Sequence, residues 1–284
     1  MMGISLVLVA ELLVLGSITG FFAGLLGVGG GMMMVPFMTW ILSSRGVEPG
    51  LAVKMAIATS MATILFTSLS SVRAHHRLGA VRWDLLRGLA PGIVLGGLAA
   101  GAGIFALVKG QGLALFFAVF IGYSALQMLL DKKPKPGRQM PGPLGQTAVG
   151  SGIGLLSGLV GAGGAFMSVP FMTWCNVPIR QAVGTSAALG FPIALANTAG
   201  YAVAGASLPP ALPGAFGYLY LPALAIIAAL SWLANRLERP RPAVPRLPDE
   251  LPRWTTTERR ARSRDLSVIT LLALACPVVV ALAR

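Results

Sequence analysis

The sequence reads GFFAGLLGVGGGMMMVPFMTW at residues 20–40 and GLLSGLVGAGGAFMSVPFMTW at residues 154–174. The offset is a constant 134 residues, and 13 of the 21 paired positions are identical. Ala58-Thr59-Ser60 and Gly184-Thr185-Ser186 form a second related pair further along each half. Such self-similarity indicates two copies of one structural unit. We assign residues 1–130 to the first copy, 131–146 to a basic linker, and 147–284 to the second copy, which contains an atypical polar segment at 235–265.

The composition around these repeats is that of an integral membrane protein. Of the 284 residues, 55% are hydrophobic and 11% are charged, and the mean hydropathy is +0.78. The formal charge of +13 comes from Lys and Arg in short runs between apolar blocks, so it reports membrane topology rather than nucleic-acid binding. Cys175 and Cys276 lie far apart in apolar sequence, which excludes a disulfide framework and a cysteine zinc site.

Apolar segments of about 20 residues can each cross the hydrocarbon core as a helix. Two apolar segments, 32–42 and 166–175, are too short to cross and follow glycine-rich breaks, so we expect half-helices there. The predicted spans are 4–27, 52–74, 85–108, 112–130, 147–164, 182–205, 218–234 and 266–283.

The basic residues predict how the two copies are oriented. Lys and Arg cluster at 73–87, 132–138 and 236–264, and all three clusters should be cytoplasmic. All three clusters can be cytoplasmic only if each half-helix returns the chain to the side of the membrane that it left. Each copy then crosses the membrane an odd number of times. The predicted fold is therefore all-α, with two inverted repeats and a binding site near the midplane where the breaks meet.

The glycine-rich breaks are the candidate site. Glycine allows unusual backbone angles and close approach of a ligand, and the first N–H groups of each half-helix lack intrahelical partners and carry positive partial charge. Two such helix starts could bind an anion through donors that carry no full charge. Alternatively, these glycines only permit tight helix crossing. The candidate backbone positions are Gly29, Gly30, Gly31, Gly163 and Gly164.

Polar side chains near the breaks could complete this pocket. Thr59, Ser60, Thr185, Ser186 and Asn197 lie in the helices that follow the half-helices, although membrane Ser and Thr often bond their own helix carbonyls instead. Two cations, Lys54 and Arg180, could attract an anion or face lipid headgroups. Glu11 is an interfacial or ion-coupling candidate because it is the only acidic residue within an apolar span.

The repeated motifs, together with PIRQAVGTSAALGFP at residues 178–192, resemble those of the TauE/SafE sulfite exporter family. The resemblance covers about residues 5 to 230 and departs from the family pattern at 231–248, where Pro and Arg become frequent. It implies a multi-pass transporter of the bacterial inner membrane for sulfite, an organosulfonate or a carboxylate.

We therefore expect a secondary permease that works by alternating access on a small anionic substrate within the lipid bilayer. Motifs of proteases and ATP-driven pumps are absent from the sequence, so we expect no enzyme activity, and we expect no cofactor, metal or nucleic acid. Coupling to protons or another ion and assembly as a homo-oligomer are left open. The alternative is a non-transporting membrane interaction or scaffold protein, whose basic segment at 235–265 recruits an acidic partner or lipid.

Overall fold

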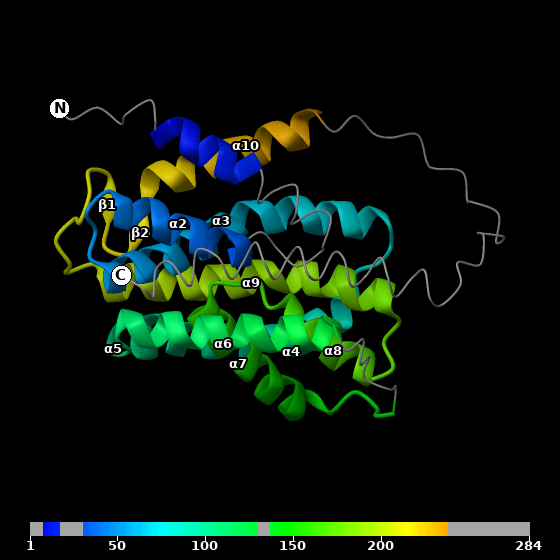
Figure 1. Ribbon diagram of the computed structural model, residues 1–284. Coiled ribbons are helices and arrows are strands. Elements are labelled where there is room, and N and C mark those ends of the chain that lie inside the picture. The colour runs from blue at the N-terminus through cyan, green and yellow to red at the C-terminus, as the bar shows by residue number, and fades with distance from the viewer. Residues whose placement is uncertain (1–7, 18–30, 130–136, 238–284) are drawn as a thin grey trace.

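The computed structural model describes residues 8–17, 31–129 and 137–237, and these residues are mostly helical (Figure 1). A short hairpin, β1 (Ala215–Phe216) with β2 (Leu219–Tyr220), is the only sheet in the described ranges. The helices are Leu8–Ser17, α2 (Gly31–Ser44), α3 (Pro49–Arg77), α4 (Trp83–Leu98), the π-helical segment η1 (Ala99–Ile104), α5 (Phe105–Leu107), α6 (Gly110–Leu129), α7 (Pro143–Val160), α8 (Ala165–Trp174), α9 (Ile179–Gly205) and α10 (Leu221–Leu237).

Two long helices, α3 and α9, pack against each other at the centre of the molecule. Both begin at proline-containing turns: Pro49 occupies the first turn of α3, and Pro178 is the N-cap of α9. Glu48 caps α3 by accepting hydrogen bonds from Gly50 N and Leu51 N, which satisfies two donors at the helix start. Side chains of α3 such as Met55, Ile57 and Met61 are fully buried in the main core.

Three helices in the described part of the chain are long and apolar enough to span a membrane: Pro49–Arg77, Trp83–Leu107 and Ile179–Gly205. They correspond to the predicted spans 52–74, 85–108 and 182–205. Helices also occur at the predicted spans 112–130, 147–164 and 218–234. Of the span predicted at 4–27 only the helix Leu8–Ser17 is described, where Gly16 packs beside Leu230 of α10. The span predicted at 266–283 lies outside the described residues.

Short helices occur where the sequence predicted half-helices at 32–42 and 166–175: these are α2 and α8. Both contain an internal proline, Pro36 or Pro170, at the corresponding position. Each is followed by a tight turn into α3 or α9, so each half-helix packs against the long helix that follows it.

Small residues set the crossing of α4 with α7. A Cβ atom built on Gly92 or Gly96 would overlap the backbone of Thr147 or Ser151, and one built on Gly154 would overlap the carbonyl of Ile93. The two backbones are therefore in direct contact, as small residues permit in membrane helices. The glycines of this crossing have a packing role.

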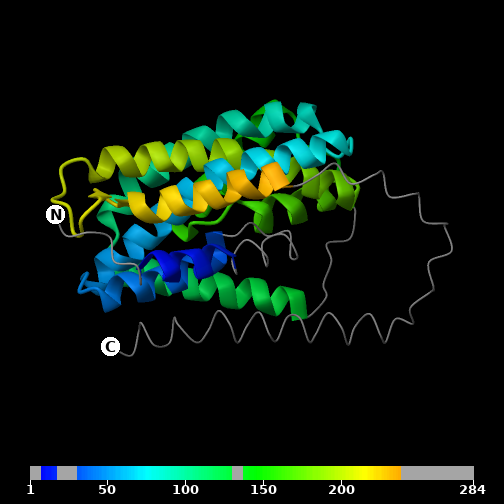
Figure 2. The same cartoon turned by 90° about the horizontal axis from the view of Figure 1, so that it is seen from above.

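The two ends of the bundle contain different elements (Figures 1 and 2). One end, called here the arginine end, contains the α3–α4 turn (78–82) and the start of α9, where Arg180 Nη2 donates to Leu78 O at 2.8 Å. The opposite end, called here the hairpin end, contains β1, β2 and the α2–α3 turn.

The hairpin was not expected from the sequence, which predicted a helix from residue 218 onward. Glycines at 214 and 217 have positive φ angles, and they turn the chain back before α10 begins at Leu221.

Candidate functional site

The two half-helices begin close together in the interior and run toward opposite ends. A Cβ atom on Gly31, the first residue of α2, would lie 2.5 Å from Gly161 O, so the start of α2 touches the break that precedes α8. From there α2 runs to the α2–α3 turn at the hairpin end, whereas α8 runs to the α8–α9 turn at the arginine end. The sequence predicted that the breaks would meet, and Gly31, the one described residue of the first break, contacts the second break at Gly161.

The second break is built by glycines in left-handed backbone conformations. Gly161 and Gly164 have φ angles of +74° and +76°, which side chains with a Cβ rarely adopt. Gly161 ends α7, and its N–H donates to Ser157 O at 2.9 Å. Gly164 is the N-cap of α8. These two glycines let the chain end one helix and start another within four residues.

Four consecutive backbone donors remain at the start of α8. The N–H groups of Met167 and Ser168 donate to Gly164 O at 3.1 and 2.9 Å. In the described part of the chain, the N–H groups of residues 163–166 have no backbone partner, and α8 has no side-chain cap. Residues 163 and 164 are buried and residues 165 and 166 are partly buried, so the first two of these donors lie away from solvent. This is the arrangement that favours an anion at a helix start.

Serine hydroxyls surround these donors. Ser168 Oγ donates to Gly164 O at 2.9 Å and lies 2.7 Å from Ser186 Oγ. Since one hydroxyl carries one proton, Ser186 donates to Ser168, and this chain of hydrogen bonds ends on the Gly164 carbonyl. Ser186 therefore lies near the break, but it contacts the Gly164 carbonyl only indirectly, through its hydrogen bond to Ser168.

Ser157 was not singled out in the sequence. The residue is 4% exposed, and its buried hydroxyl has no hydrogen-bond partner among the described residues. It lies 3.1 Å from the position of a Cβ on Gly164. The signal that could have identified it is its position four residues before Gly161, in the last turn of α7, where a side chain faces the break. Ser157 is thus a buried donor available to a ligand at the α8 start.

The other predicted hydroxyls hold the two copies together. Ser60 Oγ lies 2.9 Å from Ile57 O and 3.2 Å from Gly161 O, and its single proton is shared between these two acceptors. Thr59 Oγ1 accepts from Tyr220 N at 3.0 Å, and Thr185 Oγ1 accepts from Arg82 N at 2.9 Å. Each threonine, at corresponding positions of α3 and α9, thus binds the backbone of the segment that precedes α10 or α4. We call these two hydrogen bonds the threonine latches.

Asn197 lies where α4, α7 and α9 meet. Its Nδ2 donates to Ile193 O at 2.8 Å and to Gly154 O at 3.3 Å. Its Oδ1 is buried beside Gly158 and has no partner among the described residues. Asn197, on α9, therefore packs against Gly158 of α7, the residue next to Ser157. Its amide also joins α9 to α7 through the hydrogen bond to Gly154 O.

The predicted cations lie at the two ends of the molecule, away from the break. Lys54 Nζ donates to Ala106 O at 3.1 Å at the end of α5, and Arg180 donates to Leu78 O at the end of α3. Both side chains thus place positive charge at a helix C-terminus, which the helix dipole favours. Glu11 forms an ion pair with Arg45 at 2.6 Å, which ties the helix Leu8–Ser17 to the α2–α3 turn.

Two predicted backbone positions, Gly29 and Gly30, lie outside the described residues. Gly31 is described, and its contact with Gly161 gives it a packing role at the meeting point of the breaks. Among the described residues, no group of three or more His, Cys, Asp or Glu side chains could hold a metal ion.

Comparison with known proteins places this architecture in a family. The family model of the sulfite exporter TauE/SafE matches residues 12–244. A probable membrane transporter protein of Haemophilus influenzae is 35% identical over 226 residues, which cover 79% of this chain and 85% of that protein. Probable membrane transporter proteins of Methanocaldococcus jannaschii and Bacillus subtilis are each 27% identical, over 78% and 80% of this chain and 86% and 85% of the relatives. No solved structure matches the chain significantly. The helical membrane architecture and these matches together show that the chain belongs to the TauE/SafE sulfite exporter family, a family of membrane transporters rather than enzymes.

Proposed function

We propose that this protein is a multi-pass secondary permease of the bacterial inner membrane that carries a small anion, such as sulfite, an organosulfonate or a carboxylate. The anion binds at the start of α8, where the backbone donors of residues 163–166 and the hydroxyl of Ser157 converge. The observation that carries this proposal is the unpaired Ser157 hydroxyl beside four unpaired N–H groups in a buried break.

The chemistry of this break favours an anion over a cation. The unpaired N–H groups of residues 163–166 are donors, whereas the Gly164 carbonyl already accepts three hydrogen bonds from Met167 N, Ser168 N and Ser168 Oγ. In the described part of the chain, no hydrogen bond or ion pair joins this break to an ionised side chain. Neutral donors bind an anion without forming an ion pair, which would slow release of the anion. Their electrostatic attraction to the anion is stronger in the low-dielectric protein interior than in water.

Inverted repeats give this permease its two access routes. The opposite directions of α2 and α8 support the inversion, because inverted copies place equivalent half-helices head to head at a central site. The threonine latches support it further: Thr59 holds the segment before α10 at the hairpin end, and Thr185 holds the equivalent segment before α4 at the arginine end. In alternating access, one end opens while the latch of the other end stays closed.

The decisive experiment compares Ser157→Ala with Ser151→Ala in the purified full-length protein. Ser151 is the matched control because it lies on the same helix and its hydroxyl donates to Thr147 O in the preceding turn. Thermal stability is measured against sulfite, sulfate, thiosulfate, sulfoacetate, acetate and chloride at constant ionic strength. A bound anion at about 100 times its Kd stabilises the folded protein by about 2.7 kcal/mol.

We expect at least one oxyanion to stabilise the wild type and the Ser151 variant. Ser157→Ala should bind it about tenfold more weakly or worse, because a hydrogen bond to a charged group contributes about 1.5–3 kcal/mol. The same substitution should leave the empty protein as stable as before, since it removes a buried hydroxyl that has no partner. The proposal fails if Ser157→Ala keeps the full anion response, or if proteoliposomes containing the wild type take up none of the stabilising anion.

A further inference from the structure

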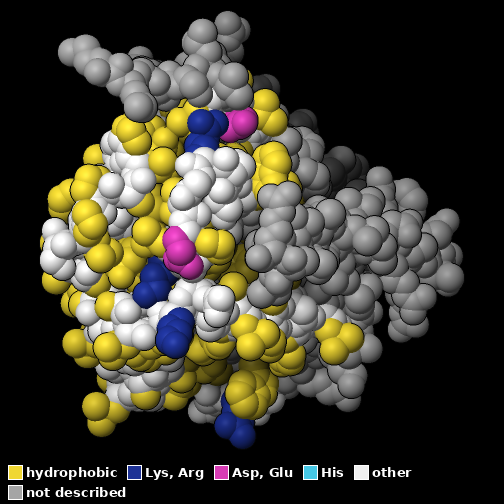
Figure 3. Space-filling model, turned by 60° about the vertical axis from the view of Figure 1, so that its left-hand side comes forward, with side chains coloured by type: hydrophobic (Ala, Val, Ile, Leu, Met, Phe, Trp, Pro, Cys, Tyr) yellow, Lys and Arg dark blue, Asp and Glu magenta, His cyan; other side chains and the backbone are white. Residues whose placement is uncertain are grey.

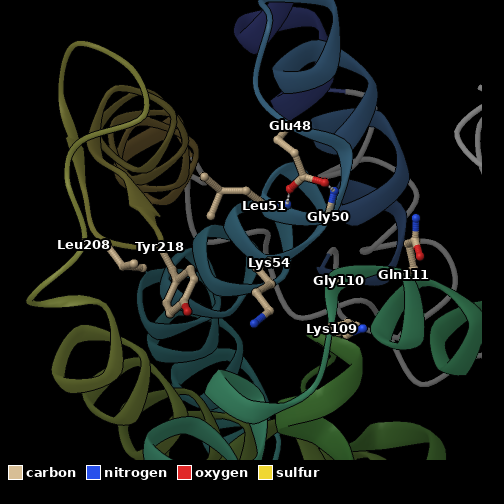
Figure 4. Close-up of a pocket in the computed structure, with 9 residues that line it drawn as sticks. All are labelled: Glu48, Gly50, Leu51, Lys54, Lys109, Gly110, Gln111, Leu208 and Tyr218. Carbon is tan, nitrogen blue, oxygen red and sulfur yellow. Dashed lines mark hydrogen bonds between the residues drawn. The ribbon is translucent and has the colours of Figure 1, made fainter.

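A second polar feature lies at the hairpin end, separate from the α8 break. It is a cavity of about 400 Å³ lined by the α2–α3 turn, the start of α3, the α5–α6 turn and the loop that leads to β2 (Figure 4). This volume is within the range of about 300–1,000 Å³ typical of small-molecule sites. The residues that matter for its chemistry are Glu48, Lys54, Lys109, Gln111 and Tyr218. Figure 3 brings this side of the molecule forward and shows few charged side chains among apolar and uncharged ones.

Lys54 is fixed in the wall of this cavity. Its Nζ donates to Ala106 O at 3.1 Å and lies 5.9 and 5.6 Å from the ring centroids of Phe105 and Tyr218. An ammonium group has three donors, and only one is used by the carbonyl. The aromatic faces stabilise the positive charge without neutralising it. Lys54 therefore retains donors and a full charge for a ligand in the cavity.

The second cation, Lys109, precedes α6 and lines the same cavity. Within the described ranges, neither Lys54 nor Lys109 forms a salt bridge; the two ion pairs there are Arg45–Glu11 and Arg82–Asp84. The carboxylate of Glu48 accepts hydrogen bonds from Gly50 N at 2.9 Å and Leu51 N at 2.8 Å, as the dashed lines of Figure 4 show. Glu48 also acts electrostatically on Lys54, so one carboxylate faces two ammonium groups and the cavity keeps an excess of positive charge.

Neutral donors add to the two cations. The first N–H groups of α6, at residues 110–112, precede the first helical hydrogen bond, Leu113 N to Lys109 O. Gly110 packs against the backbone of Gly50, which brings the starts of α6 and α3 to the same cavity. Burial raises the pKa of the Tyr218 hydroxyl, so this phenol stays protonated and can donate. Gln111 adds an amide.

We propose that this cavity is an outer anion site, in which Lys54 and Lys109 hold the sulfonate or carboxylate group of a small organic anion before it reaches the α8 break. The proposal rests on the proposed function for the identity of the ligand as the transported anion. Glu48 opposes binding through its charge and thereby keeps the outer site weak enough to release the anion inward.

The test uses purified full-length protein with sulfoacetate and sulfate as probes, titrated by calorimetry at constant ionic strength. All variants carry Ser157→Ala, which weakens the central site. Lys109→Gln should weaken binding about tenfold, because it removes a charged donor. Glu48→Gln should strengthen binding several-fold, since it removes the opposing charge and retains an oxygen that can cap α3. A gain of affinity cannot arise from loss of folded protein.

Arg77→Gln is the matched control because it also removes one positive charge but lies at the end of α3 near the arginine end. It should bind both probes with the affinity of the parent protein, which carries Ser157→Ala alone. The outer site is overturned if Lys109→Gln and Arg77→Gln behave alike, if Glu48→Gln does not tighten binding, or if the parent binds neither probe. If instead these shifts occur and proteoliposomes show no uptake, the outer site stands and the proposed permease function fails.

Discussion

Replacing the latch threonines with valine should open the two ends of the protein selectively. Thr185→Val and Thr59→Val keep the shape of the side chain but remove the oxygen that accepts from Arg82 N or Tyr220 N. Both threonine side chains are 0% exposed, so water cannot replace the lost acceptor while the end stays closed. Opening hydrates the freed N–H group, and the substitution therefore favours the open form of that end.

The size of the effect follows from the burial of each donor. An unsatisfied buried donor costs about 1–3 kcal/mol. Arg82 is half-buried, so Thr185→Val should cost about 1.4 kcal/mol, which is about a tenfold increase in the open population. Tyr220 is 3% exposed, so Thr59→Val should cost about 2 kcal/mol and increase the open population about thirtyfold.

Cysteine accessibility measures these populations. Ala80→Cys reports on the arginine end, where Ala80 is 2% exposed beneath Gly184, and Leu219→Cys reports on the hairpin end, where Leu219 is 7% exposed. The labelling rate with a hydrophilic maleimide is measured in a background without Cys175 and Cys276. Thr185→Val should accelerate labelling at residue 80 about tenfold and leave residue 219 unchanged, and Thr59→Val should do the reverse.

Thr39→Val is the control, because Thr39 is a buried threonine whose hydroxyl donates to Val35 O within its own helix. It should change neither labelling rate. Equal acceleration at both reporter positions would mean that the latches only contribute general stability. No acceleration at either position would refute the reasoning from buried donors.

Three further predictions concern single residues. Gly164→Ala should destabilise the protein by about 1–2 kcal/mol, because φ is +76° there, whereas Gly163→Ala, whose Cβ would meet Ile64 at an ordinary 3.7 Å, should melt near the wild-type temperature; equal melting temperatures would contradict the strained turn. Glu11→Gln should lower thermal stability by less than about 1 kcal/mol, since its pair with Arg45 is partly exposed, and a complete loss of anion uptake in this variant would assign Glu11 a coupling role instead. Burial raises the pKa of the Cys175 thiol, so its thiolate fraction near pH 8 is below that of free cysteine; its maleimide labelling should be slower than that of glutathione and should continue to increase above pH 9, and a rate that levels off below pH 8 would contradict this.

Much of the helical architecture was predictable because the membrane imposes simple rules. Long apolar segments had to be helices, and the short segments after the glycine-rich breaks had to begin new helices, as α2 and α8 do. The exact starts depended on local chemistry that hydropathy does not register. Glu48 and Pro49 start α3 three residues before the predicted boundary, because the cap satisfies the first donors. The hairpin before α10 depended on two glycines within an apolar segment.

The candidate site was predictable only in part. The repeat identified the breaks, because two glycine-rich turns at equivalent positions predict equivalent helix starts. The partners of individual hydroxyls were not predictable, since they depend on which segments far apart in sequence come together. Thr59 and Thr185 bind loops 161 and 103 residues away. Ser157 differs from its counterpart Ala23, so the repeat itself gave no reason to select it.

Biogenesis of this chain is constrained by the hydrogen bonds of Thr59 and Ser60. Both residues lie in the half that is synthesised first, but their partners, Tyr220 and Gly161, lie in the half that follows. Until those residues are inserted into the membrane, the first half lacks the acceptors, donors and packing surfaces that complete it. We therefore expect the first 130 residues expressed alone to be degraded in cells, and co-expression of the two halves as separate chains to restore both.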